Sequence, residues 1–174
     1  MPKTSTTTQL TTFPAKIIEL NKGFKLVHHY LPNSPVVVAD VWVRAGAAAE
    51  PEEWSGMAHF LEHMVFKGSK IVKTGEFDHI IESTGGNANA ATSHDYAHFY
   101  LTTAAKYINE TLPYLGEILL QATIPEEEFI CEREVVLEEL RSSYDDPDYL
   151  GFQALCEIIY QSHPYSRSIL GREE

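Results

Sequence analysis

The sequence has few of the features that mark several large classes of protein. Its 174 residues include only two cysteines, Cys131 and Cys156, which cannot form a disulfide framework. It contains no run of about 18 apolar residues, so it predicts no membrane span. Lysine and arginine number 13 against 25 acidic residues, whereas a nucleic-acid partner requires a basic face. We therefore expect neither a nucleic-acid partner nor a membrane partner.

The first residues lack the marks of a targeting peptide. Residues 1–14 are rich in threonine and nearly uncharged, and they contain no apolar segment of the kind that a secretory signal requires. They also lack the arginines of a transit peptide. We predict a disordered lead-in over residues 1–15 and a cytoplasmic, bacterial-like location.

The order of the hydrophobic patterns predicts an α+β fold. Two β-like segments flank a turn at residues 21–23, and residues 36–43 are a β-branched run expected to be a central or nearly central strand. Helical patterns follow, with Ser55 and Thr74 as the predicted N-caps of the first two. This order favours an antiparallel or mixed sheet with helices packed on one face. The remaining predicted elements are helices between residues 55 and 67 and at 75–83, 107–122, 125–144 and 149–161, with strands at 87–92 and 95–103.

The stretch from Ala58 to Phe66 contains the pattern His-x-x-Glu-His. On a helix, His59, Glu62 and His63 are at i, i+3 and i+4 and project from one face. Two histidines one turn apart can bind a metal, and the carboxylate can take a proton from metal-bound water. This order of residues is the inverzincin signature of zinc peptidases. For the pentapeptide alone, an ordinary surface helix is the alternative.

A strand of small residues follows in the second half of the predicted sheet. Residues 87–92 are small and polar, and such a strand allows another backbone to approach closely. It is therefore a candidate edge to which an extended peptide could add as a further strand. The alternative is a poorly packed edge strand without a function.

A third metal ligand must be sought elsewhere, because a catalytic zinc has three protein ligands and one open position. In the acidic segment 132–139, Glu132 and Glu139 are two helical turns apart and share a face. Carboxylates beside apolar residues are costly to bury unless a metal or a partner compensates. The alternative for such a helix is a solvated acidic surface.

Three spaced motifs give the chain a family resemblance. They are His59-Phe60-Leu61-Glu62-His63, the segment from Gly85 to Ser93, and Glu132-Arg133-x-Val135-Val136-x-Glu138-Glu139. In this order and spacing the chain resembles the pitrilysin, insulysin and mitochondrial-processing-peptidase family of zinc peptidases. Arg44-Ala45-Gly46 and His163-Pro164-Tyr165 fit the same family. The likeness begins at about residue 16 and is greatest to the small bacterial and processing-peptidase branch.

The resemblance implies a role for each matching residue. His59, His63 and Glu139 resemble the ligands of a Zn²⁺ cofactor, and Glu62 resembles the general base that acts on zinc-bound water. Glu132 resembles the accessory glutamate near the metal, which helps to orient a ligand or water. The implied activity is that of a zinc metalloendopeptidase acting on peptides or unfolded segments. The residues that resemble its substrate-binding edge strand are Asn89, Ala90, Ala91, Thr92 and Ser93.

The family pattern extends beyond the chain. The resemblance implies that residues 16–174 are the N-terminal part of a catalytic domain, resembling an incomplete first domain of the processing-peptidase fold. The rest of that domain and a second, homologous domain would complete a chamber around a peptide substrate. We therefore expect a homo- or heterodimer, and a fragment that could hold zinc without being active. Two alternatives are a non-catalytic family member that serves as partner or scaffold subunit of a heterodimeric peptidase, and a metal-binding module without hydrolysis.

Overall fold

The computed structural model describes residues 14–21 and 23–173. The predicted lead-in over residues 1–15 therefore lies almost entirely outside the described residues, and so does Lys22 in the first predicted turn. Among the described residues, three strands come first, two helices and two strands follow, and three helices come last. In chain order the elements are β1 (Lys16–Asn21), β2 (Phe24–His28), β3 (Val36–Val43), α1 (Met57–Val65), α2 (Glu76–Ser83), β4 (Asn87–Thr92), β5 (Ala97–Ala104), α3 (Ile108–Gln121), α4 (Glu126–Ser143) and α5 (Pro147–Tyr160).

The chain divides into two compact units, with the boundary between Ser34 and Pro35. The first unit contains the antiparallel pair β1–β2, in which Ile17 lies opposite Val27. This pair confirms the hairpin that the sequence predicts. In the part of the chain that the structure describes, every helix is too short or too polar to cross a membrane.

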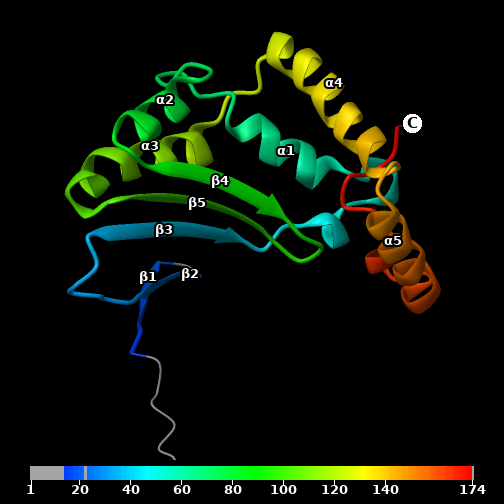
Figure 1. The fold of residues 1–174 in the computed structure, drawn as a ribbon, viewed down its shortest axis with the longest axis horizontal. Helices are drawn as coiled ribbons and strands as arrows, with labels where there is room; N and C mark the ends of the chain where they lie inside the picture. Colours follow the sequence, from blue (N-terminus) through cyan, green and yellow to red (C-terminus); the bar gives the residue numbers. More distant parts are fainter. Residues whose placement is uncertain (1–13, 22, 174) are drawn as a thin grey trace, which may run out of the picture. The chain divides into compact units, whose positions relative to one another are not determined.

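The second unit is built on a three-stranded antiparallel sheet with the strand order β3-β5-β4. Helices α1, α2 and α3 lie over one face of this sheet (Figure 1). The predicted α+β class, with an antiparallel sheet and helices on one face, is thus confirmed. The expected central position of residues 36–43 is wrong, because β3 lies at an edge of the described sheet and β5 is its middle strand. A β-branched run indicates a strand but not its place in the sheet.

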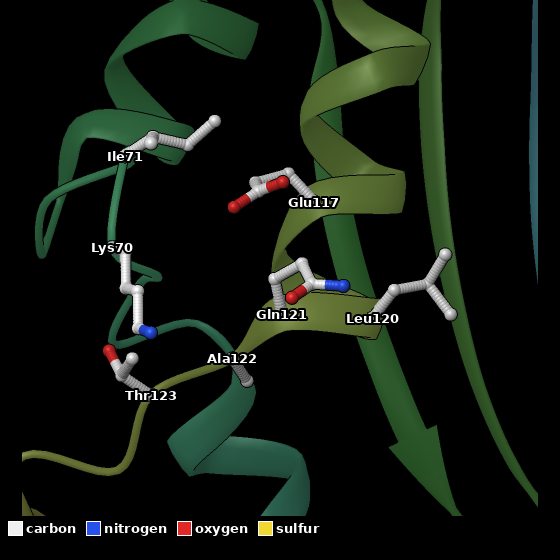
Figure 2. A pocket seen from close by; sticks show the side chains of 7 residues that line it. All are labelled: Lys70, Ile71, Glu117, Leu120, Gln121, Ala122 and Thr123. Atoms are coloured by element: carbon white, nitrogen blue, oxygen red, sulfur yellow. The ribbon is translucent and has the colours of Figure 1, made fainter.

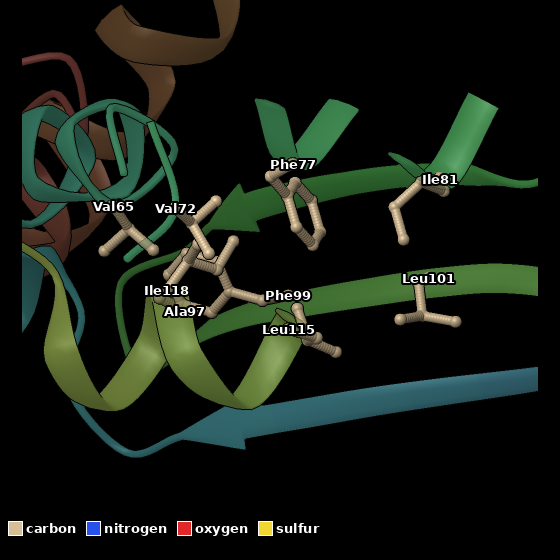
Figure 3. Packing of buried hydrophobic residues seen from close by; sticks show 9 residues of the cluster. All are labelled: Val65, Val72, Phe77, Ile81, Ala97, Phe99, Leu101, Leu115 and Ile118. Atoms are coloured by element: carbon tan, nitrogen blue, oxygen red, sulfur yellow. The ribbon is translucent and has the colours of Figure 1, made fainter. Parts of the chain in front are cut away.

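The core lies between the sheet and the helices above it (Figure 3). Strand β5 alternates buried and half-buried side chains, which is the pattern of a strand with one face on the core. Helix α3 contributes Leu115 and Ile118, whereas Leu112 is 43% exposed. The buried cluster consists of Val65, Val72, Phe77, Ile81, Ala97, Phe99, Leu101, Leu115 and Ile118.

The loop between α1 and α2 is held to the end of α3. Gly68 has φ +101°, and a Cβ there would lie 2.4 Å from the Val72 carbonyl oxygen, so glycine is required. Its own carbonyl accepts a hydrogen bond of 2.9 Å from the Thr123 N–H. An open pocket lies between this loop and α3 (Figure 2), and it contains none of the predicted site residues. The pocket is lined by Lys70, Ile71, Glu117, Leu120, Gln121, Ala122 and Thr123.

The predicted cap of α2 is also corrected in this loop. Gly75, in the left-handed conformation, is the N-cap of α2, and the Thr74 hydroxyl instead donates to the Lys67 carbonyl at 3.0 Å. Glu76 in the first turn accepts from the Lys73 N–H at 2.8 Å, which ties the start of α2 to the loop before it. Thr74 thus anchors the loop rather than the helix.

Candidate metal centre

Helix α1 presents the three residues of the His-x-x-Glu-His pattern. Its N-cap is Gly56, with φ +96°, and not Ser55 as the sequence predicts. The capping carboxylate is that of Glu50, which accepts hydrogen bonds from the Gly56 N–H at 3.0 Å and from the Ala58 N–H. A carboxylate at a helix N-terminus satisfies free N–H groups and complements the helix dipole. Glu50 therefore fixes the helix end that immediately precedes His59.

Replacing Glu50 with alanine is expected to destabilise the protein, because two backbone N–H groups lose their acceptor. Loss of a side-chain cap typically costs about 1 kcal/mol and can cost about 2 kcal/mol. Urea unfolding followed by circular dichroism measures the change. The matched control is Glu53→Ala, since Glu53 is exposed, and a surface change should stay within about 0.5 kcal/mol. Equal losses in the two variants would contradict the capping role.

Helix α4 brings two carboxylates to the histidines of α1. Phe60 of α1 and Phe129 of α4 pack edge to face, with ring centroids 4.9 Å apart. Two turns separate Glu132 and Glu139, so both carboxylates reach the same side of α1. The structure thus brings together His59, His63, Glu132 and Glu139, which the sequence places in one predicted site.

Three potential ligand atoms converge between these helices. Glu139 Oε2 lies 3.6 Å from His59 Nε2 and 3.4 Å from His63 Nε2. Tetrahedral zinc, with ligand bonds of about 2.1 Å, holds its ligand atoms roughly 3.4 Å apart. The donor set and its spacing therefore fit zinc. Among the described residues, this is the one group of three histidine, cysteine or acidic side chains that comes close enough to hold a metal.

Glu132 is the buried carboxylate of the cluster and contacts the Nδ1 side of the His63 ring. Its Oε1 lies 2.9 Å from His63 Nδ1, and its Oε2 forms an ion pair with Lys67. Burial alone would raise the pKa of the Glu132 carboxyl, but the hydrogen bonds with Lys67 and His63 outweigh it and hold that pKa below its usual value. An ionised carboxylate only accepts hydrogen bonds, so His63 Nδ1 carries the proton. In the neutral ring, the lone pair of His63 is then on Nε2, which lies 3.4 Å from Glu139 Oε2.

His59 is more deeply buried than His63, and its environment keeps the ring neutral. Burial lowers the pKa of the His59 imidazole, and this effect exceeds the opposite one of nearby Glu139, while His63 lowers the pKa further. A metal binds neutral imidazole. Protons therefore compete weakly for His59 at neutral pH.

Comparison with known proteins places the chain in one family. The model of the insulinase family, peptidase family M16, matches residues 25–173. The chain belongs to family M16. The match confirms the resemblance that the three sequence motifs indicate, and it covers both helices of the candidate metal centre.

Individual M16 relatives match most of this chain. A protein of Bacillus subtilis named as an uncharacterised zinc protease is 33% identical over 87% of the chain and 37% of its own length. The zinc protease PqqE of Helicobacter pylori is 34% identical, over 88% of the chain and 35% of its own length. The β subunit of the mitochondrial-processing peptidase of Saccharomyces cerevisiae is 31% identical, over 88% and 33%. The chain thus spans about a third of the length of the relatives it matches.

Solved M16 structures have the same fold. A protease from Helicobacter pylori superposes with a TM-score of 0.85 at 32% identity, over 91% of this chain and 38% of that one. Pitrilysin superposes with a TM-score of 0.80 at 24% identity, over 91% and 17%. The second likeness concerns the fold alone.

The predicted base and substrate strand of this M16 chain lie next to one another. The Thr92 hydroxyl of β4 donates a hydrogen bond to Glu62 Oε2 of α1. Residues 89–92 lie on β4, an edge strand of the described sheet, whereas Ser93 follows the strand. The Ser93 N–H donates to the Tyr96 carbonyl at 2.7 Å, and its carbonyl accepts from the Ala47 N–H at 3.1 Å. Ser93 therefore holds the turn together, while the four residues before it form the edge.

Two residues beside the proposed ligands, Glu50 and Lys67, are not among those that the sequence motifs single out. Glu50 gave no signal, because only the folded loop carries its carboxylate to α1. Lys67 did give one, since it follows His63 by four residues and so lies just beyond the end of α1. The ion pair between Lys67 and Glu132 joins this turn to α4.

Proposed function

We propose that this chain carries the zinc site of a metalloendopeptidase. In this proposal His59, His63 and Glu139 are the ligands. The observation that carries it is the convergence of Glu139 Oε2 and the two Nε2 atoms at ligand spacing. The chain's membership of M16 supports it, because relatives in that family are named zinc proteases. Glu132 would fix the His63 ring through Nδ1, as outer groups commonly do for histidine ligands.

We assign Glu62 as the general base. When bound, zinc lowers the pKa of its water towards about 7 and polarises a peptide carbonyl. Glu62 accepts the proton released by the attacking water and delivers it to the leaving amine. Because the Thr92 hydroxyl occupies Glu62 Oε2, we assign the proton transfer to Oε1. Thr92 would thus hold the base in a fixed orientation beside the ligands.

The edge strand β4 is the proposed platform for an extended peptide. Its side chains are small, and its other edge is already paired with β5. A peptide added to the outer edge would be bound by main-chain hydrogen bonds. The bond to be cleaved would then run past Thr92, which contacts Glu62. Unfolded or flexible segments suit this mode, because they can adopt an extended form.

The active assembly is proposed to be larger than this chain. The match covers only 37% and 35% of the length of two relatives, and a third relative is named as a subunit of a processing peptidase. We propose that a second, homologous domain or subunit completes the chamber, so that the chain alone binds zinc without full activity. A non-catalytic partner subunit is disfavoured because His59, Glu62, His63 and Glu139 are all in place.

Removal of zinc should abolish hydrolysis of a quenched fluorogenic peptide by the assembled enzyme and should also destabilise this chain. Ligand binding to the folded state adds RT ln(1 + [Zn]/Kd), which is about 2.7 kcal/mol when free zinc is 100 times Kd. Metal analysis should give one zinc per chain, and thermal unfolding with and without a chelator should show the shift. Zinc bound at one per chain, with no cleavage even by the assembled protein, would overturn the enzyme proposal.

A further inference from the structure

Lys67 is the only cation that the structure places against the buried Glu132, within the described residues. Its ammonium pairs with Glu132 Oε2, while Oε1 of the same carboxylate contacts His63 Nδ1 at 2.9 Å. The side chains of Lys67 and Glu132 are 21% and 10% exposed. Both carboxylate oxygens are therefore engaged, one by the histidine and one by the lysine.

We propose that Lys67 is a positioning residue of the metal centre: its ammonium holds the Glu132 carboxylate in the orientation that fixes the His63 ring with Nε2 free for the metal. This inference rests on the proposed zinc site and adds a further member to it. Among the hydrogen bonds and ion pairs of the described residues, none joins the Lys67 ammonium to a proposed ligand or to the general base, so we place its action through Glu132.

Hydrogen bonds hold the backbone of Lys67 on both sides, so the position from which its side chain extends is fixed. Its N–H donates to the Met64 carbonyl at 3.1 Å, and its carbonyl accepts from the Thr74 hydroxyl at 3.0 Å. The next residue, Gly68, accepts from the Thr123 N–H. The Lys67 side chain therefore begins at a fixed backbone position just after α1. Its aliphatic stem needs only to span the distance to Glu132 on α4.

The charge of Lys67 matters because Glu132 is buried. A buried carboxylate without a partner for its charge tends to turn towards water. A Glu132 carboxylate that turned away would no longer accept a hydrogen bond from His63 Nδ1. The imidazole could then place its proton on Nε2, the nitrogen that the metal needs free. Lys67 removes this alternative by satisfying the charge and one oxygen of Glu132.

The test compares three lysine variants for zinc affinity, measured by competition with a chromogenic chelator. Lys67→Met keeps the stem and removes the charge, and we expect it to weaken zinc binding 10- to 100-fold, the usual effect of losing an outer partner of a ligand. Lys67→Arg keeps the charge and should restore binding to within a few-fold of the native chain. Lys70→Met is the matched control, since Lys70 is an exposed residue of the same loop, and it should bind zinc as the native chain does.

A second measurement separates positioning from a loss of stability. Long-range ¹H–¹⁵N spectra of the zinc-free chain distinguish protonated from bare ring nitrogens. We expect His63 to carry its proton on Nδ1 in the native chain, in Lys67→Arg and in Lys70→Met, and to show a mixture in Lys67→Met. If Lys67→Met does not fold by circular dichroism, Lys67→Gln takes its place with the same expectation.

The outcomes distinguish this inference from the proposed function. Native zinc affinity together with an unchanged His63 tautomer in Lys67→Met would overturn the role of Lys67 and leave the zinc site intact. A native chain that does not bind zinc, or that binds it equally well after Glu139→Gln, would instead overturn the zinc site itself. Loss of affinity in Lys67→Met and Lys67→Arg alike, with Nδ1 protonated in both, would also refute the positioning role.

Discussion

Replacing Glu62 with glutamine is expected to reduce peptide hydrolysis by roughly 10²- to 10⁴-fold, the usual contribution of a positioned general base. The amide has nearly the size of the carboxylate, but it cannot accept a proton from water. Zinc binding should persist, because Glu62 contacts Thr92 and lies outside the group formed by His59, His63 and Glu139. A quenched fluorogenic peptide measures the rate on the assembled enzyme, and metal analysis measures the zinc content of the same sample.

The matched control for this change is Glu82→Gln on α2. Glu82 is exposed, and the substitution removes the same charge from the same unit of the chain without touching α1 or β4. It should leave hydrolysis and zinc content unchanged. A Glu62→Gln enzyme that holds zinc and still cleaves at nearly the native rate would show that another group is the base.

The helical parts of the site could be predicted because helix periodicity is local. The spacing of His59, Glu62 and His63, and that of Glu132 and Glu139, determines which side chains share a face. The family resemblance then supplied the pairing of the two helices. Sequence periodicity alone could not supply it, because the approach of α1 to α4 depends on tertiary contacts such as that between Phe60 and Phe129. The fold class followed from the order of the elements in the same way.

The predictions that failed concern contacts between residues distant from one another. Ser55 and Thr74 are of the residue types that commonly cap helix N-termini. Glycines in the left-handed conformation nevertheless occupy both N-cap positions. The capping carboxylate of α1 comes from Glu50, which the intervening loop carries to the helix end. The place of β3 in the sheet depends likewise on pairing with β5, which lies far along the chain. Local propensity indicates an element but not its partners.

Replacing Glu139 with glutamine is expected to weaken zinc binding by about 100-fold or more. Zinc sites in small peptides bind with about 10–16 kcal/mol in total, so each of four ligands contributes roughly 3 kcal/mol on average. Glutamine keeps the shape of the side chain but removes the negative charge that faces both Nε2 atoms at 3.6 and 3.4 Å. Competition with a chelator measures the affinity, and thermal unfolding should show that zinc stabilises this variant far less than the native chain.

The neighbouring residue provides a strict control for this prediction. Glu138→Gln makes the same chemical change one position earlier on α4, where the side chain is exposed and points about 100° away from Glu139. It should leave zinc affinity and the zinc-dependent rise in stability as they are. Because both variants lower the negative charge of the chain equally, a general effect of charge on cation binding would weaken both alike. Only direct ligation by Glu139 predicts a loss confined to one of two adjacent glutamates.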